Sequence, residues 1–208
     1  AYDALWKKYW NELEKDTGLL FLVGKGNNGG DALVIARHAF QDGFFNVSVL
    51  LAKGEPDHNT NAAQNLRVCR ALGIQVYQAD SNNSVAHLIK SAKWIIDGIA
   101  GTGLKRELSK SLINLVNLVN ESNAQVVAVD LPSGLSDDFN KGALICAKTT
   151  ITVGLPKRCL YLPKIRHLVG EIIVVPAGFP KELLMKNSIV AFLLTENMLS
   201  NLMPTIPI

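Results

Sequence analysis

The sequence predicts an α/β fold in which helices cover a mostly parallel central sheet. Short, wholly apolar runs alternate with amphipathic helical segments along much of the chain. Wholly apolar strands are typical of parallel sheets, because both faces of such sheets are covered. The 208 residues, 48% hydrophobic and 19% charged, suit one core-rich domain better than two very small ones.

The first elements flank a glycine-rich segment. Leu5, Tyr9 and Leu13 recur at helical spacing, which predicts a helix over residues 4–15. The apolar run at residues 19–23 predicts a buried strand, and a loop that reads Gly-Lys-Gly-Asn-Asn-Gly-Gly-Asp follows it at residues 24–31. A second helix then begins and stops at Gly43.

The alternation of strand and helix then continues, which is the pattern of a parallel sheet. The expected strands occupy residues 47–51, 74–77, 94–96 and 126–129. The expected helices between them occupy residues 59–72, 83–91 and 109–121. Each of these helical segments carries apolar residues on one face, so each has a side that can pack against the sheet.

The last third of the chain is less regular. Residues 149–153 and 171–175 predict two further strands, joined by a Pro-containing stretch at residues 155–168 in which the alternation with helices is lost. We therefore expect one domain over residues 1–186 and an exit segment over residues 187–208 that contains a linker. The chain starts at Ala1 without a methionine, which suggests that an upstream segment was removed.

Composition argues against several classes of function. The net charge is +3 with Lys and Arg scattered, so no basic surface for nucleic acid is indicated. The longest apolar runs, residues 19–23 and 189–194, are much shorter than the roughly 20 residues that span a bilayer, so no membrane association is expected. The three cysteines are widely spaced, which favours free thiols in a reducing compartment over disulfides or a zinc site. With no signal peptide visible, we expect a cytoplasmic protein.

Three carboxylates follow the carboxyl ends of predicted strands. Asp31 lies in the loop after the first strand, Asp97 ends the fourth and Asp130 ends the fifth. Because parallel strands point the same way, these ends gather along one edge, where such folds bind ligands. The common strand order also places the first strand beside the fourth, next to the turn at residues 98–103. The sequence therefore predicts one acidic site, although a single Asp at a strand end is often only a turn former.

The glycine-rich loop matches a dinucleotide-binding fingerprint incompletely. Residues 24–29 read Gly-x-Gly-x-x-Gly between a strand and a helix, so a NAD-dependent dehydrogenase has to be considered. That fingerprint expects an acidic residue at the end of the second strand, whereas Glu55 comes only after Gly54. The P-loop pattern fails because Asp31 stands where Lys is needed. The oxygen-rich loop suits hydroxyls, amides or a hard cation better than bare phosphate.

Three segments together resemble the signatures of one family. Val-Gly-Lys-Gly-Asn-Asn-Gly-Gly-Asp at 23–31, Asp-Gly-Ile-Ala-Gly-Thr-Gly-Leu at 97–104 and Val-Asp-Leu-Pro-Ser-Gly-Leu at 129–135 look like the motifs of the YjeF N-terminal family. Residues 150–157, Thr-Ile-Thr-Val-Gly-Leu-Pro-Lys, are similar to that family's fourth block, so the resemblance covers about residues 1–180. The motifs are specific together, whereas the glycine fingerprint alone is weak.

The resemblance implies a Rossmann-like three-layer αβα sandwich and an isomerase. Established members of the family are NAD(P)H-hydrate epimerases, repair enzymes that interconvert the R and S forms of hydrated NADH and NADPH (NADHX and NADPHX). A companion dehydratase that uses ATP or ADP can then restore the S form, and in bifunctional members a short linker joins the two domains. Residues 195–204 resemble the start of that linker, so we expect a fragment of a longer enzyme, and we also expect a homodimer.

Carried over position by position, the resemblance assigns the site residues. A potassium ion would take oxygen ligands from Asn28, Asp97 and Ser133, which fits the preference of hard cations. Two departures stand out, since Ala32 replaces a usual Gly and the family's N-terminal block would lie upstream of Ala1. The expected substrate contacts are Asn27, Asn28, Gly29, Gly30, Asp31, Gly101, Thr102, Gly103, Leu104, Lys105, Arg106, Glu107 and Asp130.

Asp130 is the candidate catalytic residue. Epimerisation needs a positioned acid and base, whether the hydroxyl leaves and returns or the ring opens and recloses. Asp130 ends a buried strand beside an open loop, which suits that role. Lys157 could tune Asp130 or neutralise phosphate, but a solvated charge is favoured for a solitary Lys. The alternative from another class is a non-catalytic scaffold that binds protein or RNA, and the joint retention of Asn28, Asp97, Asp130 and Ser133 argues against it.

Overall fold

The computed structural model describes residues 1–79, 82–104, 107–136, 142–180 and 182. The chain forms two compact units, residues 1–177 and residues 178–208. Of the second unit, only residues 178–180 and 182 are described. The expected domain boundary at residues 186 and 187 and the expected linker therefore lie outside the described residues.

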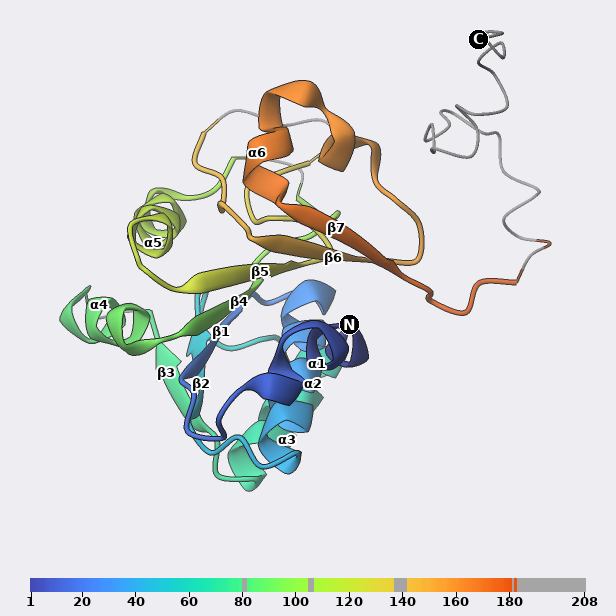
Figure 1. Ribbon diagram of the computed structural model, residues 1–208. Helices are drawn as coiled ribbons and strands as arrows, with labels where there is room; N and C mark the ends of the chain where they lie inside the picture. The colour runs from blue at the N-terminus through green and yellow to red at the C-terminus, as the bar shows by residue number, and fades with distance from the viewer. Residues whose placement is uncertain (80–81, 105–106, 137–141, 181, 183–208) are drawn as a thin grey trace, which may run out of the picture. The chain divides into compact units, whose positions relative to one another are not determined.

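The first unit is built on one seven-stranded sheet in the order β3-β2-β1-β4-β5-β6-β7, with every pair of neighbours parallel (Figure 1). The first strand lies beside the fourth, as the sequence predicts, with Val23 opposite Gly98. The carboxyl ends of all the strands therefore share one edge. The strands are β1 (Leu19–Val23), β2 (Val47–Leu51), β3 (Gln75–Gln78), β4 (Trp94–Gly98), β5 (Gln125–Val129), β6 (Thr149–Val153) and β7 (Glu171–Val175).

Helices cover both faces of the sheet, which confirms the predicted three-layer sandwich. α1, α2 and α3 lie on one face, and α4 and α5 lie on the other (Figure 1). None of the helices in the described ranges combines the length and apolar character that crossing a membrane requires. The helices are α1 (Tyr2–Lys8), α2 (Asn27–Gln41), α3 (Asn61–Ala71), α4 (Asn82–Ser91), α5 (Lys110–Asn120) and α6 (Arg166–Val169), with the 3-10 helices η1 (Trp10–Glu12), η2 (Arg158–Tyr161) and η3 (Pro163–Ile165).

Each central strand contributes to two separate hydrophobic cores. Phe21 and Ile96 pack in the core beneath α1, α2 and α3. Their neighbours Leu20 and Ile95 point the other way, into the core beneath α4 and α5. Because alternate side chains of a strand face opposite sides, a strand covered on both faces is apolar at every position. This is why the strands are readable as continuous apolar runs.

The N-terminal helix is shorter than its spacing predicts, so the expected helix over residues 4–15 was wrong in extent. α1 ends at Lys8, where Tyr9 leaves helical geometry with φ of −135°, and the single turn η1 follows. The break turns the indole of Trp10, which is 0% exposed, against the rings of Phe21 and Phe44. Burial of this large ring outweighs the regular helical pattern of the sequence.

The loss of alternation predicted a crossover from β6 to β7 without helices, and this prediction was wrong. The crossover contains η2, η3 and α6, whose buried Cys159, Leu160 and Val169 form a third small core with Leu131. A parallel pair of strands requires a crossover, and here three short helical turns provide one. Leu131 belongs to the segment after β5, so this small core braces the loop that follows Asp130.

The glycine-rich motif is mostly the start of a helix rather than a loop. α2 begins at Asn27, so only Gly24 to Gly26 connect it to β1. A Cβ at Gly24 would lie 1.9 Å from the carbonyl oxygen of Ile99, and one at Gly29 would lie 2.0 Å from the carbonyl oxygen of Gly24. These two glycines therefore let the first turn of α2 pack directly on the ends of β1 and β4. Ala32 lies in helical backbone and is fully buried, so its side chain is accommodated there.

Candidate active site

The segments that follow β1, β4 and β5 meet at one edge of the sheet. Gly24 after β1 donates its backbone N–H to the carbonyl of Gly98 at the end of β4, at 3.1 Å. Ala100, in the turn after β4, donates its N–H to the hydroxyl of Ser133, at 2.9 Å. Ser133 lies in the segment after β5. The three motifs that are far apart in the sequence are thus hydrogen-bonded to one another at the carboxyl edge.

Asp97 is completely buried and ties two of these segments together. Its Oδ1 accepts hydrogen bonds from the Ser133 hydroxyl at 2.6 Å and from the Ile99 N–H at 3.2 Å, and its Oδ2 accepts one from the Ser133 N–H at 2.7 Å. Burial raises the pKa of Asp97 to about 6, against the three hydrogen bonds, which favour the ionised form. Asp97 therefore lies behind the site and holds its walls, rather than lining an open acidic surface as the sequence suggested.

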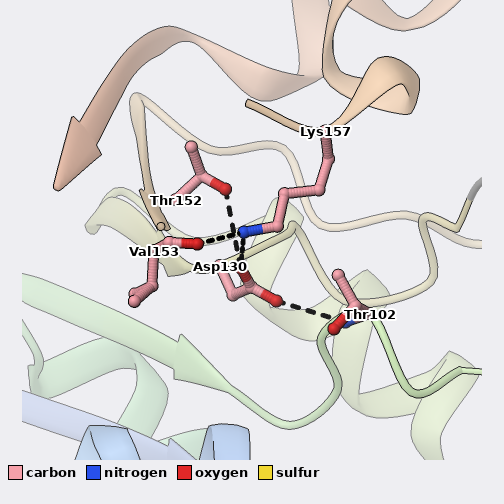
Figure 2. Close-up of polar contacts among 5 residues, drawn as sticks. All are labelled: Thr102, Asp130, Thr152, Val153 and Lys157. Atoms are coloured by element: carbon pink, nitrogen blue, oxygen red, sulfur yellow. Dashed lines mark hydrogen bonds and ion pairs between the residues drawn. The ribbon is translucent and has the colours of Figure 1, made fainter. Parts of the chain in front are cut away.

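Asp130 lies at the front of the site with its backbone and side chain both held (Figure 2). Its φ is +67°, in the left-handed region that Asp tolerates better than most residues, and its N–H donates to the carbonyl of Ile151 on β6 at 2.8 Å. Oδ2 accepts the N–H of Thr102 at 3.3 Å. Oδ1 forms an ion pair with Lys157 at 2.7 Å and accepts a long hydrogen bond from the Thr152 hydroxyl at 3.5 Å.

Asp31 is the second carboxylate at the front of the site. It lies in the first turns of α2 and its side chain reaches solvent. Even so, partial burial of its carboxyl and, secondarily, the charge of Asp130 raise the pKa of Asp31. The structure therefore brings Asp31 and Asp130 within electrostatic reach of each other, while Asp97 is held behind them.

Asn28 faces the same space as Asp130. A Cβ at Gly101 would lie 2.9 Å from Asp130 Oδ2 and 3.3 Å from Asn28 Oδ1, so only a glycine lets the turn after β4 approach both side chains this closely. Both polar atoms of the Asn28 amide are buried, and neither has a hydrogen-bond partner among the described residues. Buried amides are almost always paired, so the Asn28 amide is available to exchange hydrogen bonds with a further group.

The expected potassium ligands border one turn. Asn28 lies against Gly101, and Ser133 is bonded to Asp97 and to Ala100. Within the described ranges there is no cluster of three or more His, Cys, Asp and Glu side chains of the kind that holds zinc. Amide, carboxylate and hydroxyl oxygens are instead the chemistry that a hard monovalent cation accepts, and the unpaired Asn28 oxygen fits such an ion.

The remaining expected contact residues fall into three groups. Asn27, Thr102, Gly103 and Glu107 are exposed along the rim, and Leu104 is half-buried. Gly29 and Gly30 are buried, Gly29 against the carbonyl of Gly24 and Gly30 near Ala62 on α3. Lys105 and Arg106 lie outside the described residues.

Sequence reasoning undervalued Lys157. Its side chain is only 17% exposed and is paired with Asp130, so the favoured interpretation as a solvated charge was wrong and the alternative of contact with Asp130 holds. The signal was present in the motif Thr-Val-Gly-Leu-Pro-Lys, where the turn after β6 ends in a Lys. The backbone N–H of Thr102 could not be found from residue types, since every non-proline residue has one.

Comparison with known proteins gives a consistent picture. The family described as YjeF-related protein N-terminus matches residues 3–159. The chain is 35% identical over 170 residues to "Bifunctional NAD(P)H-hydrate repair enzyme Nnr" of Moorella thermoacetica, covering 79% of this chain and 32% of that protein. It is 30% identical over 171 residues to "NAD(P)H-hydrate epimerase" of Pirellula staleyi, covering 80% of this chain and 75% of that protein. It is 34% identical over 182 residues to "NAD(P)H-hydrate epimerase" of Elusimicrobium minutum, covering 83% and 78%.

The alignments differ in how much of each relative they cover. The chain spans about a third of the bifunctional protein from Moorella thermoacetica but about three quarters of the two epimerases. Among solved structures, the crystal structure of yeast ynu0, YNL200c, matches with a TM-score of 0.66 and 24% identity, covering 76% of this chain and 68% of that one. That similarity supports the fold alone.

Proposed function

Because the chain belongs to the YjeF-related protein N-terminus family, we propose that it is an isomerase that interconverts the R and S epimers of hydrated NADH and NADPH. The two relatives that are named NAD(P)H-hydrate epimerase and are covered over most of their length support this activity. The observation that carries the proposal is the fixed carboxylate of Asp130 beside the unpaired amide of Asn28. A repair function in metabolism follows from the chemistry of this substrate.

Asp130 acts as the general acid and base in this proposal. Epimerisation at the hydrated ring carbon requires a proton to be given and taken back, and one positioned carboxylate can do both. The Thr102 N–H and Lys157 fix the orientation of the carboxylate. A catalytic group that is already oriented needs less rearrangement before proton transfer. Asn28 supplies an amide donor and acceptor in the same space for a hydroxyl or amide group of the substrate.

The nucleotide part of the substrate is assigned to the start of α2 and the turn after β4. The backbone N–H groups of the first turn of a long helix favour anions, so the segment Asn27 to Asp31 suits the ribose and pyrophosphate. We assign the facing wall to the exposed residues Thr102, Gly103 and Glu107.

A potassium ion is assigned to Asn28, Asp97 and Ser133. The amide oxygen of Asn28 lacks a protein partner, and Asp97 is an ionisable group with no cationic side chain among its hydrogen-bond partners. A bound cation would supply positive charge that stabilises the buried carboxylate and holds the turn at residues 98–101.

The rival activity, a NAD-dependent dehydrogenase, is disfavoured by the end of β2. The acidic residue nearest to that end, Glu55, forms an ion pair with Arg70 of α3 at 2.5 Å. Glu55 is therefore paired with a residue of α3. The dinucleotide fingerprint instead requires an acidic residue that binds the ribose hydroxyls. A non-catalytic scaffold would not require the carboxylate of Asp130 to be fixed in position.

The wider setting follows from the relatives and the composition. The bifunctional relatives support a fused or separate ATP- or ADP-dependent dehydratase as the partner activity, which would consume the S epimer. A homodimer is part of the same proposal. The three widely spaced cysteines of the sequence support a reducing compartment such as the cytoplasm.

The proposal is tested by direct epimer conversion. Purified protein is mixed with the R epimer of NADPHX, and the S epimer is followed by NMR or by chromatography. Acceleration over the spontaneous rate is expected, and the same final ratio of epimers should be reached from the S epimer. A rate equal to the spontaneous rate from both starting epimers would refute an epimerase activity for this chain.

A further inference from the structure

We propose that Lys157 is the positioning residue of this site, holding the carboxylate of Asp130 oriented for proton transfer. This role rests on the proposed epimerase activity and adds a residue to it. Lys157 does not need to touch the substrate, since it acts through Asp130. The proposal stands on the contacts of its ammonium group.

The ammonium of Lys157 is held between two oxygens (Figure 2). It lies 2.7 Å from Asp130 Oδ1, and it donates a hydrogen bond to the backbone carbonyl of Val153 at the end of β6. The side chains of Lys157 and Asp130 are 17% and 15% exposed, so water screens this pair far less than it screens a surface pair. Two acceptors at fixed positions define where the charge of Lys157 lies.

The backbone after β6 explains how Lys157 reaches Asp130. Gly154 adopts a φ of +83° and donates its N–H to Val175 of β7 at 2.7 Å, so the chain turns sharply as it leaves the sheet. Pro156 then fixes the direction into Lys157, which precedes η2. The side chain of Lys157 therefore returns to the strand that it has just left.

The two oxygens of Asp130 are held from opposite segments. Oδ1 faces Lys157 and Thr152, which belong to β6 and the turn after it, while Oδ2 accepts the N–H of Thr102 from the turn after β4. A carboxylate held at both oxygens cannot rotate freely. Removing Lys157 would take away the ion pair at Oδ1 of Asp130. Of the contacts to Oδ1 drawn in Figure 2, only the 3.5 Å hydrogen bond from the Thr152 hydroxyl would then remain.

The two other roles considered for Lys157 fit the contacts less well. A solvated charge would not be 17% exposed with two oxygen partners. If Lys157 bound a phosphate, it would have to leave the carboxylate of Asp130 or hold a second anion next to that carboxylate. Either arrangement costs electrostatic energy. Neutralising and orienting Asp130 requires no such rearrangement.

Steady-state kinetics of three variants test this role in the epimer conversion assay. In Lys157→Ala we expect kcat to fall about 100-fold, the scale associated with a misplaced catalytic group, while KM changes little. Lys157→Arg keeps the charge and should recover part of kcat. Lys164→Ala is the matched control, because Lys164 is an exposed lysine in the same crossover, and its kinetics should equal those of the parent. Added methylamine should restore turnover of Lys157→Ala in proportion to its concentration.

Each alternative role gives a different result. A raised KM with kcat unchanged in Lys157→Ala would mean that Lys157 binds substrate, and would overturn the proposal. A loss of kcat that methylamine and Arg both fail to restore would mean a structural role, and would overturn it too. If the parent protein is inactive, the proposed epimerase activity fails by itself.

Unfolding in urea tests the ion pair without any need for activity. The double variant of Asp130→Asn and Lys157→Ala should lose less stability than the two single variants lose together, because either substitution alone removes the same pair. Additive losses would show that the pair is not formed, and would overturn the proposal independently of turnover.

Discussion

Replacing Ser133 by Ala should destabilise the protein in a pH-dependent way, because the Ser133 hydroxyl serves a buried carboxylate. The hydroxyl donates to Asp97 Oδ1 at 2.6 Å and accepts the N–H of Ala100 at 2.9 Å. A hydrogen bond to a charged group contributes about 1.5 to 3 kcal/mol, and an unpaired N–H that water can partly reach costs about 1 kcal/mol. We therefore expect Ser133→Ala to lower the free energy of unfolding by about 2.5 to 4 kcal/mol at pH 8.

The pH dependence follows from the raised pKa of Asp97. Burial lifts this pKa from its ordinary value of 3.8 to about 6, so the folded state holds its proton more tightly than the unfolded state does. The parent protein is therefore stabilised by Asp97 below pH 4 and loses up to about 3 kcal/mol as pH rises through about 6. In Ser133→Ala the ionised form loses its shortest hydrogen bond, so the deficit relative to the parent should grow between pH 5 and pH 8.

Urea unfolding at pH 5 and pH 8 in potassium-free buffer measures this difference. Ser122→Ala is the matched control, because the Ser122 hydroxyl also donates one hydrogen bond and accepts another, but no carboxylate is involved. It donates to the carbonyl of Val119 at 2.7 Å and accepts the N–H of Ala124 at 3.3 Å. The Ser122 variant should show the same small loss at both pH values. An equal loss for Ser133→Ala at pH 5 and pH 8 would refute the assignment of its hydroxyl to an ionised Asp97.

Two further substitutions and one ion titration test the same edge of the sheet. Gly24→Ala should cost more than about 3 kcal/mol in urea unfolding, because its Cβ would lie 1.9 Å from the Ile99 carbonyl oxygen, whereas Gly26→Ala, with nothing within 4 Å, should cost less than about 1 kcal/mol. Equal losses would contradict the close packing. Exchange of choline chloride for potassium chloride should raise the melting temperature of the parent protein by mass action, and Asn28→Ala should abolish the rise. A rise that persists in Asn28→Ala would remove Asn28 from the ion site.

The sheet was predictable because its strands have only one physical requirement. Strands covered on both faces are mostly apolar, although β2 carries Ser48 and β6 carries three buried Thr residues, and the limits expected for β1, β2, β6 and β7 match those of the structure. The helices between them were readable from one apolar face. The limits of α1 were not readable, because they depend on where Trp10 finds its aromatic partners in the folded chain.

The edge that carries the site was predictable, but the division of work among its carboxylates was not. Asp31, Asp97 and Asp130 look alike in the sequence, each beside a flexible turn. Their difference arises from tertiary contacts, since Asp97 is fully buried against Ser133 and Ile99 while Asp130 is only partly buried. Whether a carboxylate is buried and hydrogen-bonded depends on how segments far apart in the sequence are aligned in the fold.

Lys157 illustrates the same limit. Its contact with Asp130 exists because β5 and β6 are neighbours and because Asp130 bonds to Ile151 across them. A sequence shows a lone Lys after a Gly-x-Pro turn, and lysines in turns are mostly solvated. The fold converts it into a half-buried partner of the candidate catalytic group.

The most direct test of the central claim is the rate of epimer conversion by Asp130→Asn beside the parent protein. Asn accepts the left-handed backbone of Asp130, where φ is +67°, so the variant should fold with an unchanged circular dichroism spectrum. It cannot take up or release the proton, so its rate should fall by about 100-fold or more. A folded Asp130→Asn protein that converts the epimers as fast as the parent would contradict the account.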